Sequence, residues 1–159
     1  MEETEIFSGC IEPALEWEEG DEVVLQPVYM IPVEVFRTGF FSRPSYKTVT
    51  VVVDASAGRA HITRGKDALR VREMEPPGMR LPANLSRRTA VMIAEGAAVA
   101  EGREGWRSFT RSCHVMAREE KTVACWKAWI RSTDSLTDST SGKKVALGEM
   151  LGLLLHQAE

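Results

Sequence analysis

The stretch Thr-Val-Thr-Val-Val-Val-Asp-Ala-Ser-Ala-Gly-Arg-Ala-His-Ile-Thr, residues 48–63, predicts a β-hairpin. Its first six residues are valine or threonine, whose β-branched side chains suit a strand better than a helix. Asp54 and Gly58 bracket a tight turn, because an aspartate side chain can accept a hydrogen bond from the turn backbone and glycine can adopt the positive φ that ends it. Arg59 begins the return strand.

The segment before the hairpin is also predicted to be extended. In residues 23–37, apolar residues alternate with partly polar ones, and Pro27 and Pro32 rule out a continuous helix. Since proline lacks the N–H that a central strand donates, we expect part of this segment at a sheet edge or as two short strands. Together with residues 46–53 and 60–63, it predicts a three-stranded antiparallel meander.

The C-terminal half indicates a second meander. Residues 106–117 and 121–131 have strand character, and residues 132–142 form a polar segment that predicts a loop. In residues 121–131 both faces of the strand are partly apolar. A strand of this kind needs cover on two sides.

Two longer helices are expected. Residues 85–101 are rich in alanine, and Gly96 within them is interpreted as a close approach of another backbone. Residues 145–157 carry a leucine stripe at helical spacing. Shorter helical candidates lie at residues 12–18 and 66–74.

The sequence therefore predicts an α+β fold: an antiparallel sheet of about five or six strands built from two meanders, with two packed helices on one face. A chain of 159 residues favours a single domain, residues 1–159. The Pro- and Gly-rich segment 75–83 leaves open a division into two degenerate halves, residues 23–75 and 84–159.

A short motif occurs twice. Asp54 to Arg59 has the order aspartate, three small residues, glycine and a basic residue, and Asp138 to Lys143 repeats it. Each copy follows a predicted strand that ends in arginine, Arg37 in the first case and Arg131 in the second. A degenerate repeat and a chance likeness both remain open.

At these residues the sequence resembles the PepSY family and related small α+β modules, in which a helix leads into a hairpin whose second strand runs into an Asp-x-x-Thr/Ser-Gly turn. The resemblance covers residues 33–63 and, more loosely, 85–147. It implies a binding or regulatory module rather than an enzyme. The chain departs from the family in having Ala57 where threonine or serine is usual, and in lacking the export signal that family members usually carry.

The composition limits which classes of partner the sequence favours. The chain has 20 basic and 23 acidic residues and a formal net charge of −3, so its bulk charge favours neither nucleic acid nor an anionic membrane. We see no signal peptide and no window of about 18 apolar residues, so no membrane segment is expected. The three cysteines are odd in number and far apart, which favours reduced thiols and a cytoplasmic protein.

No catalytic, metal or cofactor site is predicted. Cys113, His114, Cys125 and His156 lack the paired spacing of zinc ligands. On a strand, the adjacent Cys113 and His114 also point to opposite faces. The role of Cys113, His114 and Cys125 stays open, and no glycine-rich phosphate loop is present.

The candidate contacts with another protein are Phe40, Phe41, Trp126 and Trp129. Phe40 and Phe41 fall in a predicted loop, and the two tryptophans fall on the strand with two apolar faces. Packing within the same domain is the competing interpretation. The sequence thus favours a non-catalytic protein- or ligand-binding or regulatory module, with a small enzyme as the alternative. Its excess apolar surface predicts a two-fold homodimer, and cover by a different protein partner is the alternative.

Overall fold

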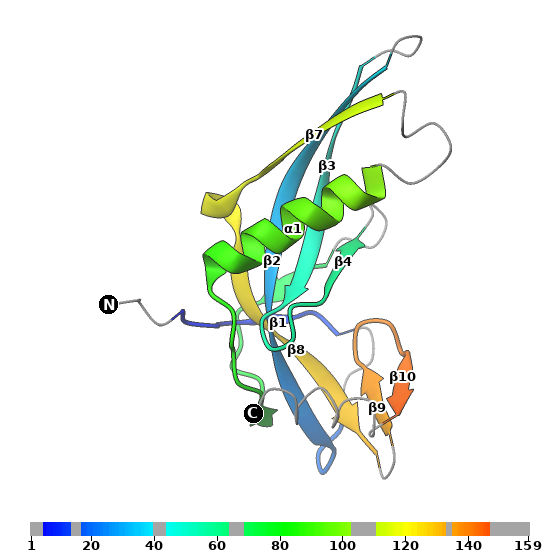
Figure 1. The fold of residues 1–159 in the computed structure, drawn as a ribbon. Helices are drawn as coiled ribbons and strands as arrows, with labels where there is room; N and C mark the ends of the chain where they lie inside the picture. Colours follow the sequence, from blue (N-terminus) through cyan, green and yellow to red (C-terminus); the bar gives the residue numbers. More distant parts are fainter. Residues whose placement is uncertain are drawn as a thin grey trace.

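One strand, β2 (Glu22–Gly39), is 18 residues long and runs through the whole sheet (Figure 1). The computed structural model describes residues 5–13, 17–39, 44–63, 69–102, 111–132 and 135–146. Over these residues the fold is α+β, with a ten-stranded, mostly antiparallel mixed sheet and one α-helix. The other elements are β1 (Cys10–Ile11), β3 (Ser45–Asp54), β4 (Ala60–Thr63), β5 (Val71–Arg72), β6 (Met79–Arg80), α1 (Arg87–Gly102), β7 (Arg111–Ala117), the 3₁₀ turn η3 (Glu119–Lys121), β8 (Val123–Arg131), β9 (Ser135–Asp138) and β10 (Lys144–Ala146).

The main path of the sheet is β10–β9–β8–β2–β3–β4. Along one edge of β2, the first half pairs with β8 and the second half with β7, both antiparallel. Along the other edge β2 pairs with β6, in parallel, and then with β3. Strand β1 lies parallel to β8 and antiparallel to β5. Strands from both sides of the segment 75–83 thus pair with β2.

The expectation that Pro27 and Pro32 place this segment at an edge, or divide it, is wrong. Both prolines lie where β2 changes its neighbour. The carbonyl of Pro32 accepts from the N–H of Arg118, so the ring nitrogen faces the gap between β7 and β8. The carbonyl of Pro27 accepts from the N–H of Ala55, where the ladder with β3 ends. Since no ladder donor is needed at these two places, a central strand tolerates both prolines.

The three-stranded meander and the helix over residues 85–101 are confirmed as β2–β3–β4 and α1. Ser86 caps α1, because its Oγ accepts from the N–H of Thr89 at 3.2 Å. Ala90, Ala94 and Ala98 recur every turn and are buried, which lets the helix pack closely across β2, β3 and β7 (Figure 1). Gly96 lies on the exposed side instead, and apart from its chain neighbours and the adjacent backbone of α1, no described atom lies within 4 Å of a Cβ built there, so its expected close approach is wrong.

Burial changes along β2. Its odd-numbered apolar side chains from Val23 to Val35 are buried, and those from Tyr29 to Val35 pack against α1. Its even-numbered side chains face the other way; Val28 is buried there beside Ile11 and Cys125, whereas Phe36 is 40% exposed. The first half of β2 is therefore covered on both faces and the second half on the α1 face only.

The repeated motif forms the same turn twice. In each copy the aspartate N–H donates to the carbonyl of the basic residue at 2.8 Å, and the glycine N–H donates to the aspartate carbonyl. In each copy the aspartate Oδ1 also accepts, at 2.8 Å, from the N–H two residues later. Gly58 and Gly142 have φ values of 79° and 76°. The registers agree as well, since Val28 pairs with Asp54 as Trp129 pairs with Asp138. The likeness of the two motifs is thus one of structure.

The expected sheet of five or six strands with two helices is wrong in its finer points. Residues 135–138 and 144–146 are strands β9 and β10, where a polar loop and the start of a helix were expected. The rest of the helix predicted for residues 145–157 lies outside the described residues. Where a helix was expected over residues 66–74, the described part contains strand β5. The described residues of the 12–18 candidate are not helical.

Candidate functional site

The tryptophans expected to contact another protein lie in the core. Trp126 and Trp129 project from opposite faces of β8, and each is at most 9% exposed. The Nε1 of Trp126 donates to the carbonyl of Phe7 at 3.1 Å, and the Nε1 of Trp129 donates to Oε1 of Gln26 at 2.9 Å. Their rings and polar ends are thus used within the chain. Phe40 and Phe41 lie outside the described residues.

The cysteines and histidines lie apart. Cys125 is fully buried, and burial raises the pKa of its thiol to about 12, so it stays protonated. Cys113 is half-buried and faces α1, whereas His114 is exposed on the opposite face of β7. His156 lies outside the described residues. Over the part of the chain that the structure describes, no group of three or more His, Cys, Asp or Glu side chains is placed to hold a metal ion.

A buried polar group lies where β2 and β8 cross the middle of the sheet. Gln26 and Lys127 face each other in the ladder, and the Nζ of Lys127 lies 2.9 Å from Oδ2 of Asp138. Burial acts to raise the pKa of Asp138, but hydrogen bonds from Lys127 and Thr140 lower it overall. The charges of Lys127 and Asp138 compensate each other. This buried cluster is therefore suited to holding β9 against β8 rather than to catalysis.

Three ring side chains form a row on the surface of the sheet. Tyr46, Phe36 and His114 are direct cross-strand neighbours on β3, β2 and β7, on the face away from α1. Tyr46 is 62% exposed, His114 is exposed, and Met116 in the next row is 50% exposed. We call these four side chains, Phe36, Tyr46, His114 and Met116, the aromatic face. The alternation in residues 33–38 signals it, because Val33 and Val35 fill the core and Phe36 therefore points outward.

Glu34 is a charged residue on β2 that lies next to this row, on the same face of the sheet. Its Oε1 accepts from the hydroxyl of Tyr46 at 2.6 Å, and its Oε2 lies 2.8 Å from Arg118. The bond from Tyr46 and then the bond from Arg118 lower the pKa of Glu34, and the same bond to Glu34 raises the pKa of Tyr46. The carboxylate is thus ionised and compensated, which leaves the aromatic face without an unpaired charge from Glu34.

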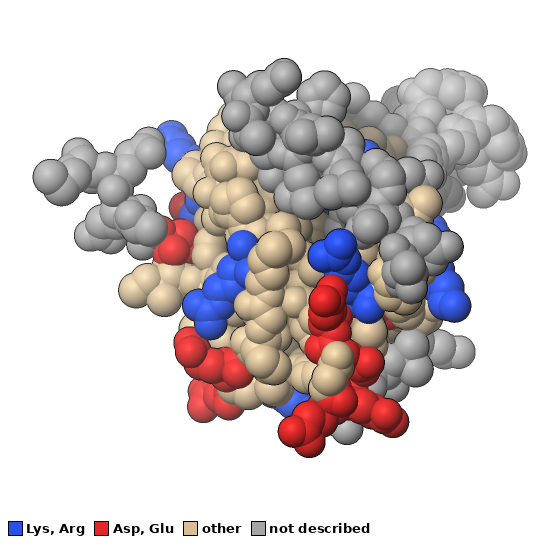
Figure 2. Space-filling model, turned by 90° about the horizontal axis from the view of Figure 1, so that it is seen from below, with Lys and Arg blue, Asp and Glu red and all other residues tan. Residues whose placement is uncertain are grey.

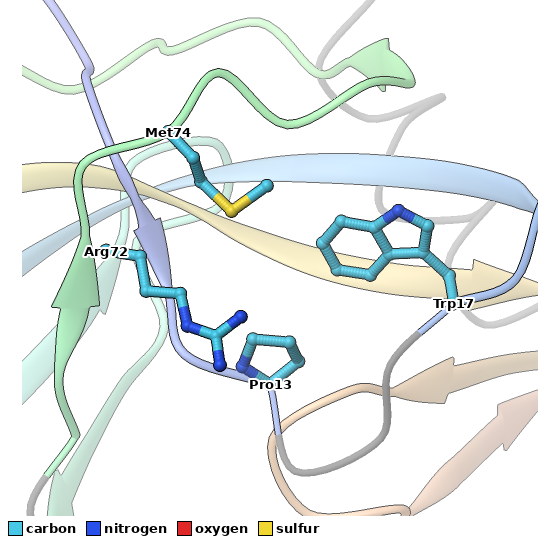
Figure 3. Close-up of a pocket in the computed structure, with 4 residues that line it drawn as sticks. All are labelled: Pro13, Trp17, Arg72 and Met74. Carbon is cyan, nitrogen blue, oxygen red and sulfur yellow. The ribbon is translucent and has the colours of Figure 1, made fainter.

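A small pocket lies between the N-terminal segment and the segment after β5 (Figure 3). Its volume is about 200 Å³, and Pro13, Trp17, Arg72 and Met74 line it. Figure 3 shows the sulfur arm of Met74 reaching toward the indole of Trp17, with the guanidinium of Arg72 beside Pro13. Arg72 makes an ion pair with Glu12 at 2.9 Å. The pocket is large enough for one apolar side chain.

A wider cleft of about 490 Å³ lies at the start of α1. Its polar side chains are largely committed to the fold. Arg87 forms an ion pair with Glu5 and donates to the carbonyl of Thr122 at 2.8 Å, and the hydroxyl of Tyr29 donates to the carbonyl of Leu85 at 3.0 Å. The cleft thus joins the N-terminal segment to α1, and Arg87 and Tyr29 are occupied by contacts within the chain.

Charged side chains of both signs share the end of the molecule seen in Figure 2. Acidic groups gather at the lower edge of that view, with basic groups directly above them. The ion pair between Arg131 and Glu22, at 3.6 Å, joins the adjacent ends of β8 and β2. The described charges at this end are therefore of mixed sign.

No helix among the described residues is both long and apolar enough to span a membrane. No family model matches the chain, and neither does a curated protein or a solved structure. The resemblance to the PepSY family therefore stays a prediction.

Proposed function

We propose that the chain is a non-catalytic protein-binding module that holds an amphipathic helix of a partner protein against the aromatic face. The observation that carries this proposal is the exposed row of Tyr46, Phe36 and His114 across three paired strands. Contiguous apolar side chains on a sheet face mark interaction sites more often than single exposed ones do.

The spacing of the row suits a helix. Neighbouring strands are about 4.8 Å apart, and one turn of an α-helix rises about 5.4 Å, so a helix lying across the strands meets one aromatic side chain per turn. The same three strands already hold a helix on their other face, where α1 contacts β2, β3 and β7 (Figure 1). A bound helix would complete a second layer on the uncovered face.

The charges favour an apolar stripe on that helix. Glu34, which lies next to the row, is compensated by Arg118 and Tyr46, and therefore attracts little further charge. A partner helix with apolar residues at positions i, i+3 or i+4, and i+7 would fill the row without burying an unpaired charge. Its polar side would stay in water.

An enzyme is less well supported by the described residues. The buried carboxylates of Asp54 and Asp138 both accept hydrogen bonds from their own turns. The two cavities described above are lined by side chains that hold the fold together. The proposal places the chain in the cytoplasm, where the thiols of Cys10, Cys113 and Cys125 remain reduced.

The test is selection from a displayed library of helical peptides with randomised surface positions. We expect selected peptides to carry an apolar i, i+3 or i+4, i+7 stripe and to lose at least tenfold in affinity for a Phe36→Gln variant. Met92, 67% exposed on α1, provides the matched control, and Met92→Gln should bind as the wild type does. Equal binding to wild type and Phe36→Gln, or selected peptides without a stripe, would overturn the proposal.

A further inference from the structure

Strand β7 forms an outer edge of the sheet. Within the described residues it pairs with β2 alone, over its full length (Figure 1). The N–H of Arg118 donates to the carbonyl of Pro32, which shows that even-numbered residues of this segment direct their backbone groups toward β2. The backbone groups of Cys113, Val115 and Ala117 therefore point away from β2, because N–H groups alternate along a strand.

This edge lacks the features that usually prevent strands from pairing. Between the arginines at positions 111 and 118, the sequence Cys113-His-Val-Met-Ala117 contains no proline, lysine or acidic residue. Natural edge strands are commonly kept apart by lysine, proline, bulges or very short length. β7 has 7 residues, whereas the other terminal strands of the main path, β4 and β10, have 4 and 3. β7 is thus the edge best suited to accept another strand.

We propose that two copies of this chain pair antiparallel through β7, with the two-fold axis at His114. β7 is symmetric about this residue, so Cys113 of one copy pairs with Val115 of the other, and position 111 pairs with Ala117. All these residues direct their N–H and C=O groups outward, so this register makes about eight backbone hydrogen bonds. The pairing does not depend on the proposed helix-binding function.

Charge favours the antiparallel orientation of the second copy over the parallel one. In the antiparallel register, the arginine at position 111 lies opposite the uncharged Ala117 of the other copy. In a parallel, in-register pair, each arginine would lie beside its own equivalent, which costs free energy by like-charge repulsion. The chain therefore suits an antiparallel copy of itself better than a parallel one.

The paired sheet would also extend the aromatic face. His114 of one copy would stand next to His114 of the other, with Phe36 and Tyr46 continuing outward on both sides. Six aromatic side chains would then lie in one row across six strands, in the order Tyr46, Phe36, His114, His114, Phe36, Tyr46. Each copy contributes half of this composite surface.

The experiment is the mass in solution at micromolar concentration, without any peptide. For the wild type we expect about twice 17.7 kDa by light scattering. Val115→Pro removes an N–H that points away from β2 and should raise the dimer dissociation constant at least tenfold. Ile62→Pro is the matched control, because Ile62 also directs its N–H outward, on β4, and also packs partly on the α1 core. It should remain dimeric.

A second variant covers the case in which Val115→Pro fails to fold. His114→Lys places two ammonium groups side by side at the axis without touching the core, and should also give a monomer, whereas Thr48→Lys on the same face should not. In the wild type, hydrogen exchange at the outward amides of Val115 and Ala117 should be slow. A wild-type monomer that persists at 100-fold higher concentration, or a dimer that survives both β7 variants, would overturn the inference. Phe36→Gln should leave the dimer intact, which separates this test from that of helix binding.

Discussion

The Nζ of Lys127 lies 2.9 Å from Oδ2 of Asp138, and both side chains are about nine-tenths buried. Among the described residues, the equivalent aspartate of the first turn, Asp54, makes no ion pair; Gln26, which faces Lys127 across the ladder, donates a hydrogen bond to it instead. Two turns with the same backbone geometry therefore hold their carboxylates in different electrostatic surroundings. Burial raises the pKa of Asp54, whereas the bonds from Lys127 and Thr140 lower that of Asp138.

The same substitution should thus have different effects in the two turns. Asp138→Asn leaves Lys127 buried without an anion and should lower the free energy of unfolding by about 3–5 kcal/mol at pH 7. Asp54→Asn keeps the acceptor for the N–H of Ser56 and removes a buried charge, so it should be neutral or stabilising by up to about 1 kcal/mol. Urea unfolding measures both. Equal losses in the two variants would contradict the assignment.

The pH dependence of stability should separate the two aspartates as well. The lowered pKa of Asp138 adds stability that is present above the unfolded value of about 3.9 and is lost as the pH falls through the folded pKa. The raised pKa of Asp54 does the opposite, since its charged form costs stability above the folded pKa. The difference between wild type and Asp54→Asn should therefore shrink as the pH is lowered toward 4, and a difference that grows would be the wrong sign.

Replacing two glycines by alanine should change the stability of the fold in opposite directions. Gly58 has a φ of 79°, and a Cβ there would lie 3.3 Å from Cδ1 of Leu85, so Gly58→Ala should cost roughly 1–2 kcal/mol. Gly96 is helical, and outside the adjacent backbone of α1 no described atom lies within 4 Å of its Cβ position, so Gly96→Ala should stabilise the fold by roughly 0.5–1 kcal/mol. Thermal unfolding of both variants provides the measurement. A destabilised Gly96→Ala would mean that something covers this side of α1.

The thiols should react at very different rates. Cys10 and Cys125 are fully buried and burial raises the pKa of both, whereas Cys113 is only partly buried. A thiolate-specific reagent should therefore modify Cys113 first, and Cys113→Ser should show almost no reaction until denaturant is added. Fast reaction of two thiols in the folded protein would contradict the placement of β1 against β8.

Tyrosine ionisation should report the contact on the aromatic face. The chain has two tyrosines, and the bond to Glu34 is the main cause of the raised pKa of Tyr46. Glu34→Gln removes the negative charge that opposes the phenolate, so the pKa of Tyr46 should fall toward the ordinary value of about 10. The pKa of Tyr29 should not change, because burial, and not Glu34, is the main cause of its raised value. Ultraviolet titration near 295 nm follows both groups, and an unchanged profile would show that Tyr46 does not bond to Glu34.

Local sequence signals predicted the elements whose ends are marked by turn or capping residues. The β-branched run before Asp54 and the alanine-rich stretch after Ser86 gave β3 and α1 within two residues at each end. The status of β2 as a central strand could not be seen locally, because the neighbours that make Pro27 and Pro32 harmless come from distant segments. Single-sequence patterns do not report which strands meet.

The C-terminal hairpin and the site show the same limit. β9 contains little apolar character apart from Leu136, and it is a strand because β8 and β10 pair with it. The repeated motif at Asp138 was a usable signal for this hairpin. Trp126 and Trp129 were expected as contact residues because their strand is apolar on both faces. The cover comes from distant segments: Cys10 of β1 packs with Trp126, and Leu136 of β9 and Leu81 pack with Trp129. Phe36, by contrast, was readable from the alternation with Val33 and Val35.

The role of β2 as the shared strand also sets the order in which the chain can fold. β3 and β4 follow it closely along the chain, so this meander can form while synthesis continues, whereas β7 and β8 reach the ribosome exit only after α1 has been made. Because synthesis adds roughly 5–20 residues per second, the edge of β2 that pairs with β7 and β8 stays unpaired for several seconds. During that interval the nascent chain presents a long unpaired strand to its surroundings, and pairing over such a separation is slow. We expect chaperone dependence and low refolding yields at high concentration to originate at this edge.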